Sequence, residues 1–222
     1  MTREPSDADL RRQNMVAHQI AQRGITDRRL LEAMRKVRRE AFVPEGYKEM
    51  AFEDGPLPIG EDQTISQPYI VAMMAEAASI QPGDRILEVG TGSGYAAAVF
   101  AELAAQVYTI ERHPSLAAQA ETALRTLGYS SVSVRTGDGT RGWAEAAPFD
   151  AIIVAASGPH VPDSLKDQLA IGGRLVMPIG VSRPQSLYKV TRLGRERYDA
   201  ENLGPVQFVL LVGEEGWADV RG

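Results

Sequence analysis

A glycine-rich turn between a buried strand and a helix constrains the fold of this chain more than any other feature. Residues 86–89 read Ile-Leu-Glu-Val, an apolar run of strand length, and the residues after them read Gly-Thr-Gly-Ser-Gly-Tyr. Three glycines at alternate positions let the backbone turn sharply and let a ligand approach it closely. The free N–H groups at the start of the following helix then face that ligand. The motif predicts a ligand-binding strand–turn–helix unit.

Strands and helices alternate around this turn in the manner of parallel βαβ units. The pattern predicts strands at residues 85–89, 106–110, 132–136, 150–155 and 173–178, and helices at 68–79, 95–104, 114–127 and 162–170. Two closing strands, predicted at 185–193 and 206–212, are separated by too few residues for a crossover helix, so we expect them to be antiparallel. The chain is therefore predicted to be an α/β protein with a mainly parallel sheet.

The first 50 residues carry a helical pattern of their own. Apolar residues recur at roughly helical spacing until Gly24 interrupts them, and Asp27 is a candidate cap for a second helix. Residues 51–67 are loop-rich, and a long loop in a compact domain is more often functional than idle. We predict two regions: a helical region with a covering loop at residues 1–80, packed on a core at residues 81–222.

Composition excludes whole classes of chemistry. The chain has 222 residues, no cysteine, three histidines and a net charge of -5. It therefore has no disulfide, thiolate metal site or cysteine nucleophile, and we expect no metal. No apolar run reaches the ~18–20 residues of a membrane span, and the start is polar and acidic, so we expect a cytoplasmic protein. We expect no nucleic-acid partner, and interpret the basic residues 35–39 as the solvated end of a helix.

Three acidic residues lie at the same predicted edge of the sheet. Glu88 lies on the strand before the glycine turn, Glu111 ends the next strand, and Asp138 follows the third. Open α/β sheets bind ligands at this edge, and an acid at the second strand accepts hydrogen bonds from ribose hydroxyls. Asp138 can accept from an adenine amino group, and Glu88 can support an ammonium group through the loop or water. Each acid alone also fits a solvated position or a turn, but their coincidence favours a nucleoside site.

The glycine turn departs from the dinucleotide-binding fingerprint. Gly-x-Gly-x-x-Gly requires glycine at position 95, where this chain has Tyr95. A pyrophosphate would also not favour the carboxylate of Glu88 nearby. Gly-x-Gly-x-Gly after an acidic strand residue is the pattern of S-adenosylmethionine-dependent methyltransferases. The turn therefore predicts S-adenosyl-L-methionine as the ligand.

Ser66 lies in the segment Gln-Thr-Ile-Ser-Gln-Pro-Tyr at residues 63–69. From the residues alone, a serine just before a helix with an early proline reads as an N-cap, with a role in the site as the less favoured alternative. A nucleophilic role has little support, because no Gly-x-Ser-x-Gly elbow surrounds Ser66.

Over about residues 10–215 the chain resembles the protein-L-isoaspartate (D-aspartate) O-methyltransferase family. The glycine turn marks only the methyltransferase class, whereas Thr-Ile-Ser-Gln-Pro-Tyr is far more specific to this family. The resemblance implies a Rossmann-like, S-adenosylmethionine-dependent methyltransferase sheet with a helical N-terminal extension and antiparallel C-terminal strands. The segments that carry it include residues 23–25, 39–44, 56–60, 63–69, 88–95, 137–139, 149–154 and 169–180.

The resemblance also implies an activity. Such enzymes transfer a methyl group from S-adenosyl-L-methionine to the α-carboxylate of L-isoaspartyl residues in damaged proteins and peptides, and release S-adenosyl-L-homocysteine. The ester cyclises spontaneously to a succinimide, which partly hydrolyses to aspartate. The resemblance places Ser66 in the active site, and we interpret it as a hydrogen-bond donor that orients the acceptor carboxylate.

The resemblance and the residue pattern together assign the site. The residues predicted to bind the cofactor are Gln63, Thr64, Ile65, Glu88, Gly90, Thr91, Gly92, Gly94, Glu111, Asp138 and Gly139. The residues predicted to bind the substrate are Ser66, Gln207 and Val209. We expect a monomer whose partners are isoaspartyl-containing proteins and peptides.

Several positions depart from the family pattern, among them residues 157–160 after the fourth predicted strand. Asp62 stands where glycine commonly precedes Gln-Thr-Ile-Ser, and it makes the loop acidic together with Glu53, Asp54 and Glu61. Gln207 and Leu210 stand where bacterial members usually carry arginine and proline, beside the substrate cleft. These departures keep two alternatives open: a methyltransferase of the same fold for another carboxylate or a small molecule, and a non-catalytic S-adenosylmethionine-binding module.

Overall fold

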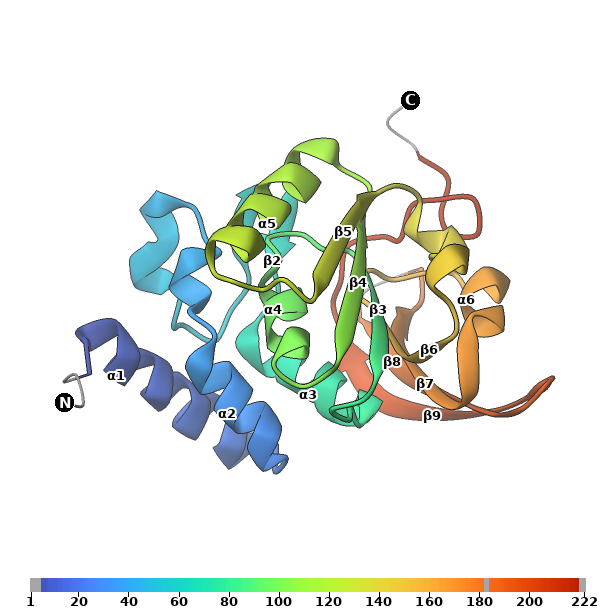
Figure 1. Cartoon of the computed structure of the whole chain (residues 1–222), viewed down its shortest axis with the longest axis horizontal. Helices are drawn as coiled ribbons and strands as arrows, with labels where there is room; N and C mark the ends of the chain where they lie inside the picture. The colour runs from blue at the N-terminus through green and yellow to red at the C-terminus, as the bar shows by residue number, and fades with distance from the viewer. Residues whose placement is uncertain (1–4, 182–183, 220–222) are drawn as a thin grey trace.

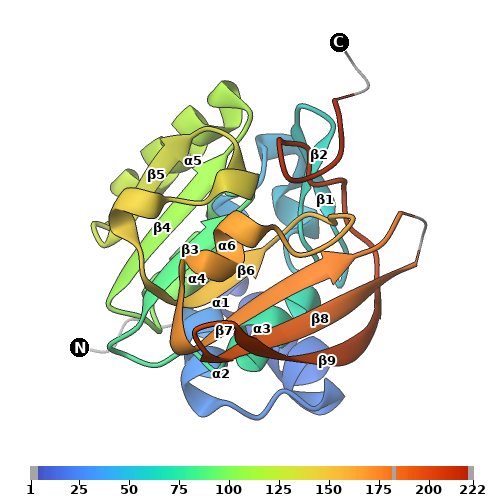
Figure 2. The same cartoon turned by 90° about the vertical axis from the view of Figure 1, so that its right-hand side faces the viewer.

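The computed structural model describes residues 5–181 and 184–219. Across these residues the chain forms one seven-stranded sheet in the order β5-β4-β3-β6-β7-β8-β9 (Figures 1 and 2). The first five strands in that order are parallel, and β8 runs antiparallel to both β7 and β9. The strands are β3 (Arg85–Val89), β4 (Gln106–Glu111), β5 (Val132–Thr136), β6 (Phe149–Val154), β7 (Leu169–Ile179), β8 (Gln185–Gly194) and β9 (Arg197–Val206).

The order of the strands creates a switch point beside β3. The connection from β3 leads to β4 on one side, whereas the connection from the neighbouring β6 leads to β7 on the other side. Val89 aligns with Ile110 on β4 and with Val154 on β6, so the three strands end level with one another. Ligands of open α/β sheets bind at this place, outside the carboxyl ends of the strands.

Helices cover both faces of the sheet, and the alternation of strand side chains separates two apolar clusters. Ile86 and Ile153 face one cluster with α2, α3, α4 and α5, whereas Leu87 and Val154 face the other with α6. Figure 2 shows α6 on one side of the sheet and α3 on the other. The helices are α1 (Asp7–Asn14), α2 (Arg28–Lys36), α3 (Pro68–Ala78), α4 (Tyr95–Ala101), α5 (Pro114–Thr126) and α6 (Asp163–Asp167).

The N-terminal region is helical, as predicted. A π-helical turn at Met15–Ile20 and a 3₁₀ turn at Ala21–Arg23 follow α1, and Gly24 ends them with a φ of 98°. Asp27 caps α2, because its side chain accepts hydrogen bonds from the backbone N–H groups of the first helical turn. The expected boundary signals at Gly24 and Asp27 are both confirmed.

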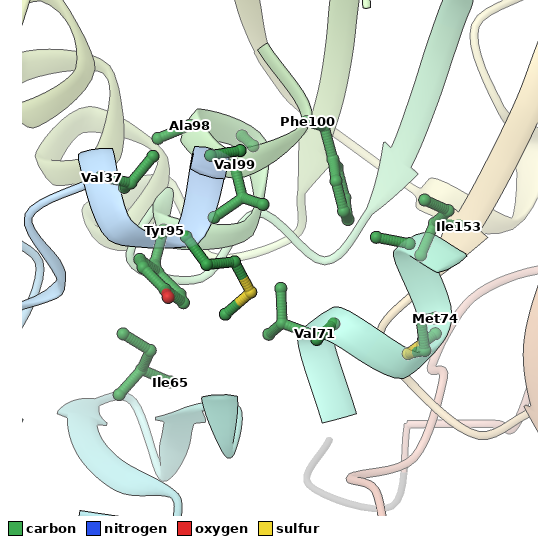
Figure 3. Packing of buried hydrophobic residues seen from close by; sticks show 14 of the residues in the cluster. Val37, Ile65, Val71, Met74, Tyr95, Ala98, Val99, Phe100 and Ile153 are labelled. Atoms are coloured by element: carbon green, nitrogen blue, oxygen red, sulfur yellow. The ribbon is translucent and has the colours of Figure 1, made fainter. Parts of the chain in front are cut away.

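The N-terminal helices pack onto the sheet through a shared apolar cluster (Figure 3). Val37 after α2, Ile65, Val99 on α4 and Ile153 on β6 all belong to it. Their side chains are nearly inaccessible to water, so the region before β3 is held to the sheet by hydrophobic burial. The core thereby fixes where the loop before α3 crosses the end of the sheet.

The segment predicted as loop at residues 51–67 contains a β-hairpin. β1 (Leu57–Gly60) pairs antiparallel with β2 (Gln63–Ile65), and buried and exposed residues alternate along β1. Pro58 lies on its exposed face, where a two-stranded ladder tolerates a missing N–H. Because proline is unusual within strands, the two prolines in this segment favoured the prediction of a loop.

The predicted last strand at 206–212 is wrong. β9 ends at Val206, and in the segment beyond it Leu210 makes an isolated bridge with Ser157. β9 is an edge strand with mostly exposed polar residues, so it lacks a strand-like apolar pattern. Residues 209–212 instead lie beside the carboxyl ends of the strands.

Two smaller predictions also need correction. The helix expected at 162–170 is the short α6, because the chain enters β7 at Leu169. Arg39, expected at a solvated helix end, is fully buried, and its Nε donates to the carbonyl oxygen of Ala51 at 2.8 Å. Burial lowers the pKa of Arg39 to about 10. In the described ranges, no helix is long and apolar enough to cross a membrane.

Gly94 at the start of α4 provides a stability test with a matched control. Gly94 and Gly128 have similar φ values of 88° and 85°, but a Cβ on Gly94 would approach Leu124 Cδ1 to 3.2 Å, whereas one on Gly128 would meet nothing within 4 Å. We expect Gly128→Ala to cost about 1 kcal/mol and Gly94→Ala about 2–4 kcal/mol, because the second adds crowding to backbone strain. Urea denaturation measures both, and equal losses would contradict the packing argument.

Candidate active site

A cavity lies at the carboxyl ends of β3, β4 and β6, where open α/β sheets bind their ligands. The hairpin β1–β2 and the segment after β9 supply its outer walls. The cavity brings together most of the predicted site residues: Gln63, Thr64, Ile65, Ser66, Glu88, Gly90, Thr91, Gly92, Glu111, Gly139 and Val209.

Glu88 is a buried carboxyl group in the wall of this cavity. Its side chain accepts a hydrogen bond from the Thr109 hydroxyl at 2.6 Å, and the Thr91 and Thr109 hydroxyl oxygens are 2.7 Å apart. Burial raises the pKa of Glu88 to about 8, against the opposing effect of the Thr109 hydrogen bond. A cationic group of a ligand would favour the charged form of Glu88 here.

Glu111 braces the glycine turn from the end of β4. Its Oε2 accepts a hydrogen bond from the Gly92 N–H at 2.9 Å, and its Oε1 accepts from the His113 N–H at 3.0 Å. Each carboxylate oxygen has a second lone pair, so Glu111 can also accept from a ligand hydroxyl. The side chain is nearly buried and lines the cavity, where the sequence placed a ribose.

Two predicted cofactor residues do not line the cavity. Gly94 packs against Leu124 on α5. The carboxylate of Asp138 is hydrogen-bonded to other backbone groups. Its Oδ1 accepts from the Thr140 N–H at 2.9 Å, and its Oδ2 accepts from the Glu214 N–H at 2.8 Å. The carboxylate of Asp138 thereby attaches the segment after β9 to the end of β5. Its contact with an adenine amino group stays a prediction.

A groove adjoins the cavity and contains Gln207, the remaining predicted residue. Ser66 and Val209 line both spaces, so they lie at the junction between them. Ser66 does not cap α3, because Gln67 occupies the N-cap position and no side chain there makes a capping bond. The N-cap interpretation of Ser66 is therefore wrong, and its position favours the active-site alternative.

The cavity also contains residues that sequence reasoning missed. Arg112 and His113 follow Glu111 directly, and Ala155 follows β6, so the rule that ligands bind at carboxyl strand ends could have identified them. Tyr95, Leu211 and Val212 carry no comparable signal. Within the described part of the chain, no group of three or more acidic or histidine residues is arranged to hold a metal ion.

The fold and the site define a class of protein. A glycine turn after the central strand, an acid at the end of its neighbour and a cavity at the switch point characterise a Rossmann-like, S-adenosylmethionine-dependent methyltransferase.

Comparison with known proteins then identifies the family. The sequence model of the protein-L-isoaspartate(D-aspartate) O-methyltransferase family matches residues 10–216. Protein-L-isoaspartate O-methyltransferase 1 of Rhodopseudomonas palustris (strain HaA2) is 57% identical over 94% of this chain and 86% of its own length. Protein-L-isoaspartate O-methyltransferase 2 of Marinobacter nauticus is 54% identical over 98% of this chain and 100% of its own length. The chain belongs to the protein-L-isoaspartate(D-aspartate) O-methyltransferase family.

Solved structures agree with this assignment. A protein-L-isoaspartate O-methyltransferase superposes with a TM-score of 0.84 at 28% identity, over 92% of this chain and 67% of that one. A beta-aspartate methyltransferase from Plasmodium falciparum, in complex with S-adenosyl-L-homocysteine, superposes with a TM-score of 0.79 at 26% identity, over 90% of this chain and 98% of that one. The predicted fold class and family are confirmed.

The raised pKa of Glu88 predicts a pH-dependent stability. In the ligand-free folded protein, Glu88 keeps its proton up to about pH 8, whereas in the unfolded chain it loses the proton near its ordinary value of 4.5. The folded state therefore binds more protons between these values, and stability falls as pH rises through that range. Over this range we expect the free energy of unfolding of the wild type to fall by an amount on the order of 2–5 kcal/mol. Glu88→Gln cannot titrate at this position, so it should not show this fall. Denaturant titrations from pH 5 to 9 measure it, and parallel curves for the two proteins would contradict it.

Proposed function

We propose that the cavity and the adjoining groove perform S-adenosylmethionine-dependent methylation of the α-carboxylate of L-isoaspartyl residues in damaged proteins and peptides. The position of Ser66, which lines both spaces, carries this proposal. A methyl donor held in the cavity would present its methyl group toward an acceptor held in the groove. Such a protein is an enzyme of protein repair, because the methyl ester leads through a succinimide toward aspartate.

The residues of the cavity fit the proposed cofactor. S-adenosyl-L-methionine supplies an activated methyl group on a positively charged sulfur. Glu111 would hold the ribose hydroxyls, the turn at Gly90–Gly92 would approach the methionine part, and Gln63 to Ile65 would cover it. Glu88 adds the acidic group that a cationic ligand favours.

The chemistry requires little of the protein beyond alignment. The acceptor carboxylate is already an anion at pH 7, so no general base is needed. Ser66 would donate a hydrogen bond that orients this carboxylate, and the hairpin would exclude water. Correct orientation of two reactants can supply ~7–11 kcal/mol of barrier reduction.

Family membership favours this acceptor over another carboxylate, a small molecule or a non-catalytic role. The identity to named protein-L-isoaspartate O-methyltransferases extends over more than nine-tenths of the chain. The groove beside Ser66 provides a second space, next to the cavity, in which an acceptor can lie. The monomeric state and the cytoplasmic location stay predictions.

A pair of peptides tests the proposed function. The peptides differ only in carrying L-isoaspartate or L-aspartate, and each is incubated with the protein and S-adenosylmethionine labelled at the methyl group. We expect base-labile label on the isoaspartyl peptide alone, because only that residue exposes the required α-carboxylate. Equal labelling of both peptides, or binding of the cofactor without any transfer, would overturn the proposal.

Ser66→Ala tests the orienting hydrogen bond. We expect kcat on the isoaspartyl peptide to fall by about 10–100-fold, since a hydrogen bond to a charged group contributes roughly 1.5–3 kcal/mol. The urea midpoint should stay near that of the wild type, because Ser66 does not cap α3. Wild-type turnover by this variant would remove Ser66 from the site.

Glu111→Ala tests the cofactor assignment. We expect the affinity for S-adenosyl-L-homocysteine to fall by about 1–3 kcal/mol, through the lost carboxylate and the unbraced glycine turn. Isothermal titration calorimetry measures the change. Asp150→Ala, which removes a carboxylate bonded to the opposite end of β3, is the control and should bind normally.

A further inference from the structure

The tip of the hairpin β1–β2 adopts an unfavourable backbone conformation. Glu61 and Asp62 have φ values of 52° and 55°, and Gly60 before them has 98°. Apart from glycine, asparagine and aspartate, residues rarely occupy this left-handed region, so Glu61 in particular adds strain to the turn. The hairpin base is fixed by the buried residues Leu57, Ile59 and Ile65, whereas both tip residues are exposed.

Glu61 connects this tip to the start of α5. Its Oε1 accepts a hydrogen bond from the Ser115 hydroxyl at 2.6 Å, and its Oε2 lies 3.8 Å from His113 Nδ1. Glu61 and Ser115 are 54 positions apart in the sequence. The link therefore crosses between two separate elements and is not part of the local turn.

The attachment point lies next to the braced glycine turn. His113 lines the cavity, and its backbone N–H donates to Glu111, whose other oxygen accepts from Gly92. Gln63, Thr64 and Ile65, which follow Glu61 in the same hairpin, also line the cavity. The contact of Glu61 with α5 thus connects two segments whose neighbouring residues both line the cavity.

We propose that Glu61 is a positioning residue that latches the hairpin to α5 and thereby retains the cofactor in the cavity. The proposal rests on the proposed function and deepens it, because it assigns control of cofactor release to one contact. The Glu61 side chain is 46% exposed, so water can compete for the latch and the tip can release without unpacking the hairpin base. Glu61 acts through Gln63 to Ile65 and does not itself line the cavity.

The rate of cofactor release tests the latch. Labelled S-adenosyl-L-homocysteine bound to the full chain is displaced by excess unlabelled ligand, and its dissociation rate is followed. We expect Glu61→Ala to raise this rate by about 3–10-fold, with a matching rise in the KM for S-adenosylmethionine. Ser115→Ala should produce a similar increase, and the double variant should release no faster than the faster single variant, because both changes remove one contact.

Matched variants separate the latch from a general effect. Glu121→Ala removes the same side chain from an exposed position farther along α5 and should leave release unchanged. Glu61→Gln keeps an acceptor for Ser115 and should restore slow release. Each variant is also compared with the wild type in its urea midpoint, so that a loss of folding is recognised.

Two results would overturn the proposal, and they are distinguishable. If the wild type binds S-adenosyl-L-homocysteine and methylates the isoaspartyl peptide, but Glu61→Ala and Ser115→Ala release the ligand at the wild-type rate, only the latch is wrong. If the wild type itself fails to bind S-adenosyl-L-homocysteine, the proposed function and the latch are both wrong.

Discussion

The site depends first on how the backbone of the glycine turn is held at the end of β3. The Gly90 N–H donates to the carbonyl oxygen of Ile110 at 2.8 Å, and the Gly92 N–H donates to Glu111. Both acceptors belong to the end of β4, so the neighbouring strand determines the shape of the turn. Because a glycine-rich backbone is conformationally free, it becomes a defined ligand surface only through such external bonds.

The walls of the cavity come from the two ends of the chain. The hairpin β1–β2 reaches the cavity from the N-terminal region, and residues 209–212 reach it after β9. Polar contacts hold each wall in place. Glu61 of the hairpin bonds to Ser115 on α5, and in the segment after β9 Glu214 bonds to Asp138 and Asp219 to Arg112. The parallel strands supply a rigid base, and weaker, more exposed contacts hold the parts that enclose a ligand.

The sequence predicted the bounds of a strand correctly where its residues are apolar and the structure buries them. The bounds of β3 match the predicted strand, because a central strand must be apolar and a glycine turn follows it. The bounds of β5 also match, because its two valines alternate with polar residues although it lies at the edge of the sheet. Prediction failed where an edge strand is polar, as in β9, and where prolines occur in a short ladder, as in β1. Arg39 shows the same limit, since only the fold reveals that its guanidinium is enclosed beside Tyr95.

The sequence by itself determined the class of fold, the glycine turn, the acids that follow the strands and the family. These depend on local patterns and on residues close together along the chain. The tertiary structure alone decided that Ser66 lies between a cavity and a groove, that Asp138 is bonded to Glu214, and that Glu61 meets Ser115. These contacts join segments tens of residues apart, and their distances follow only from how the helices and the last strands pack on the sheet.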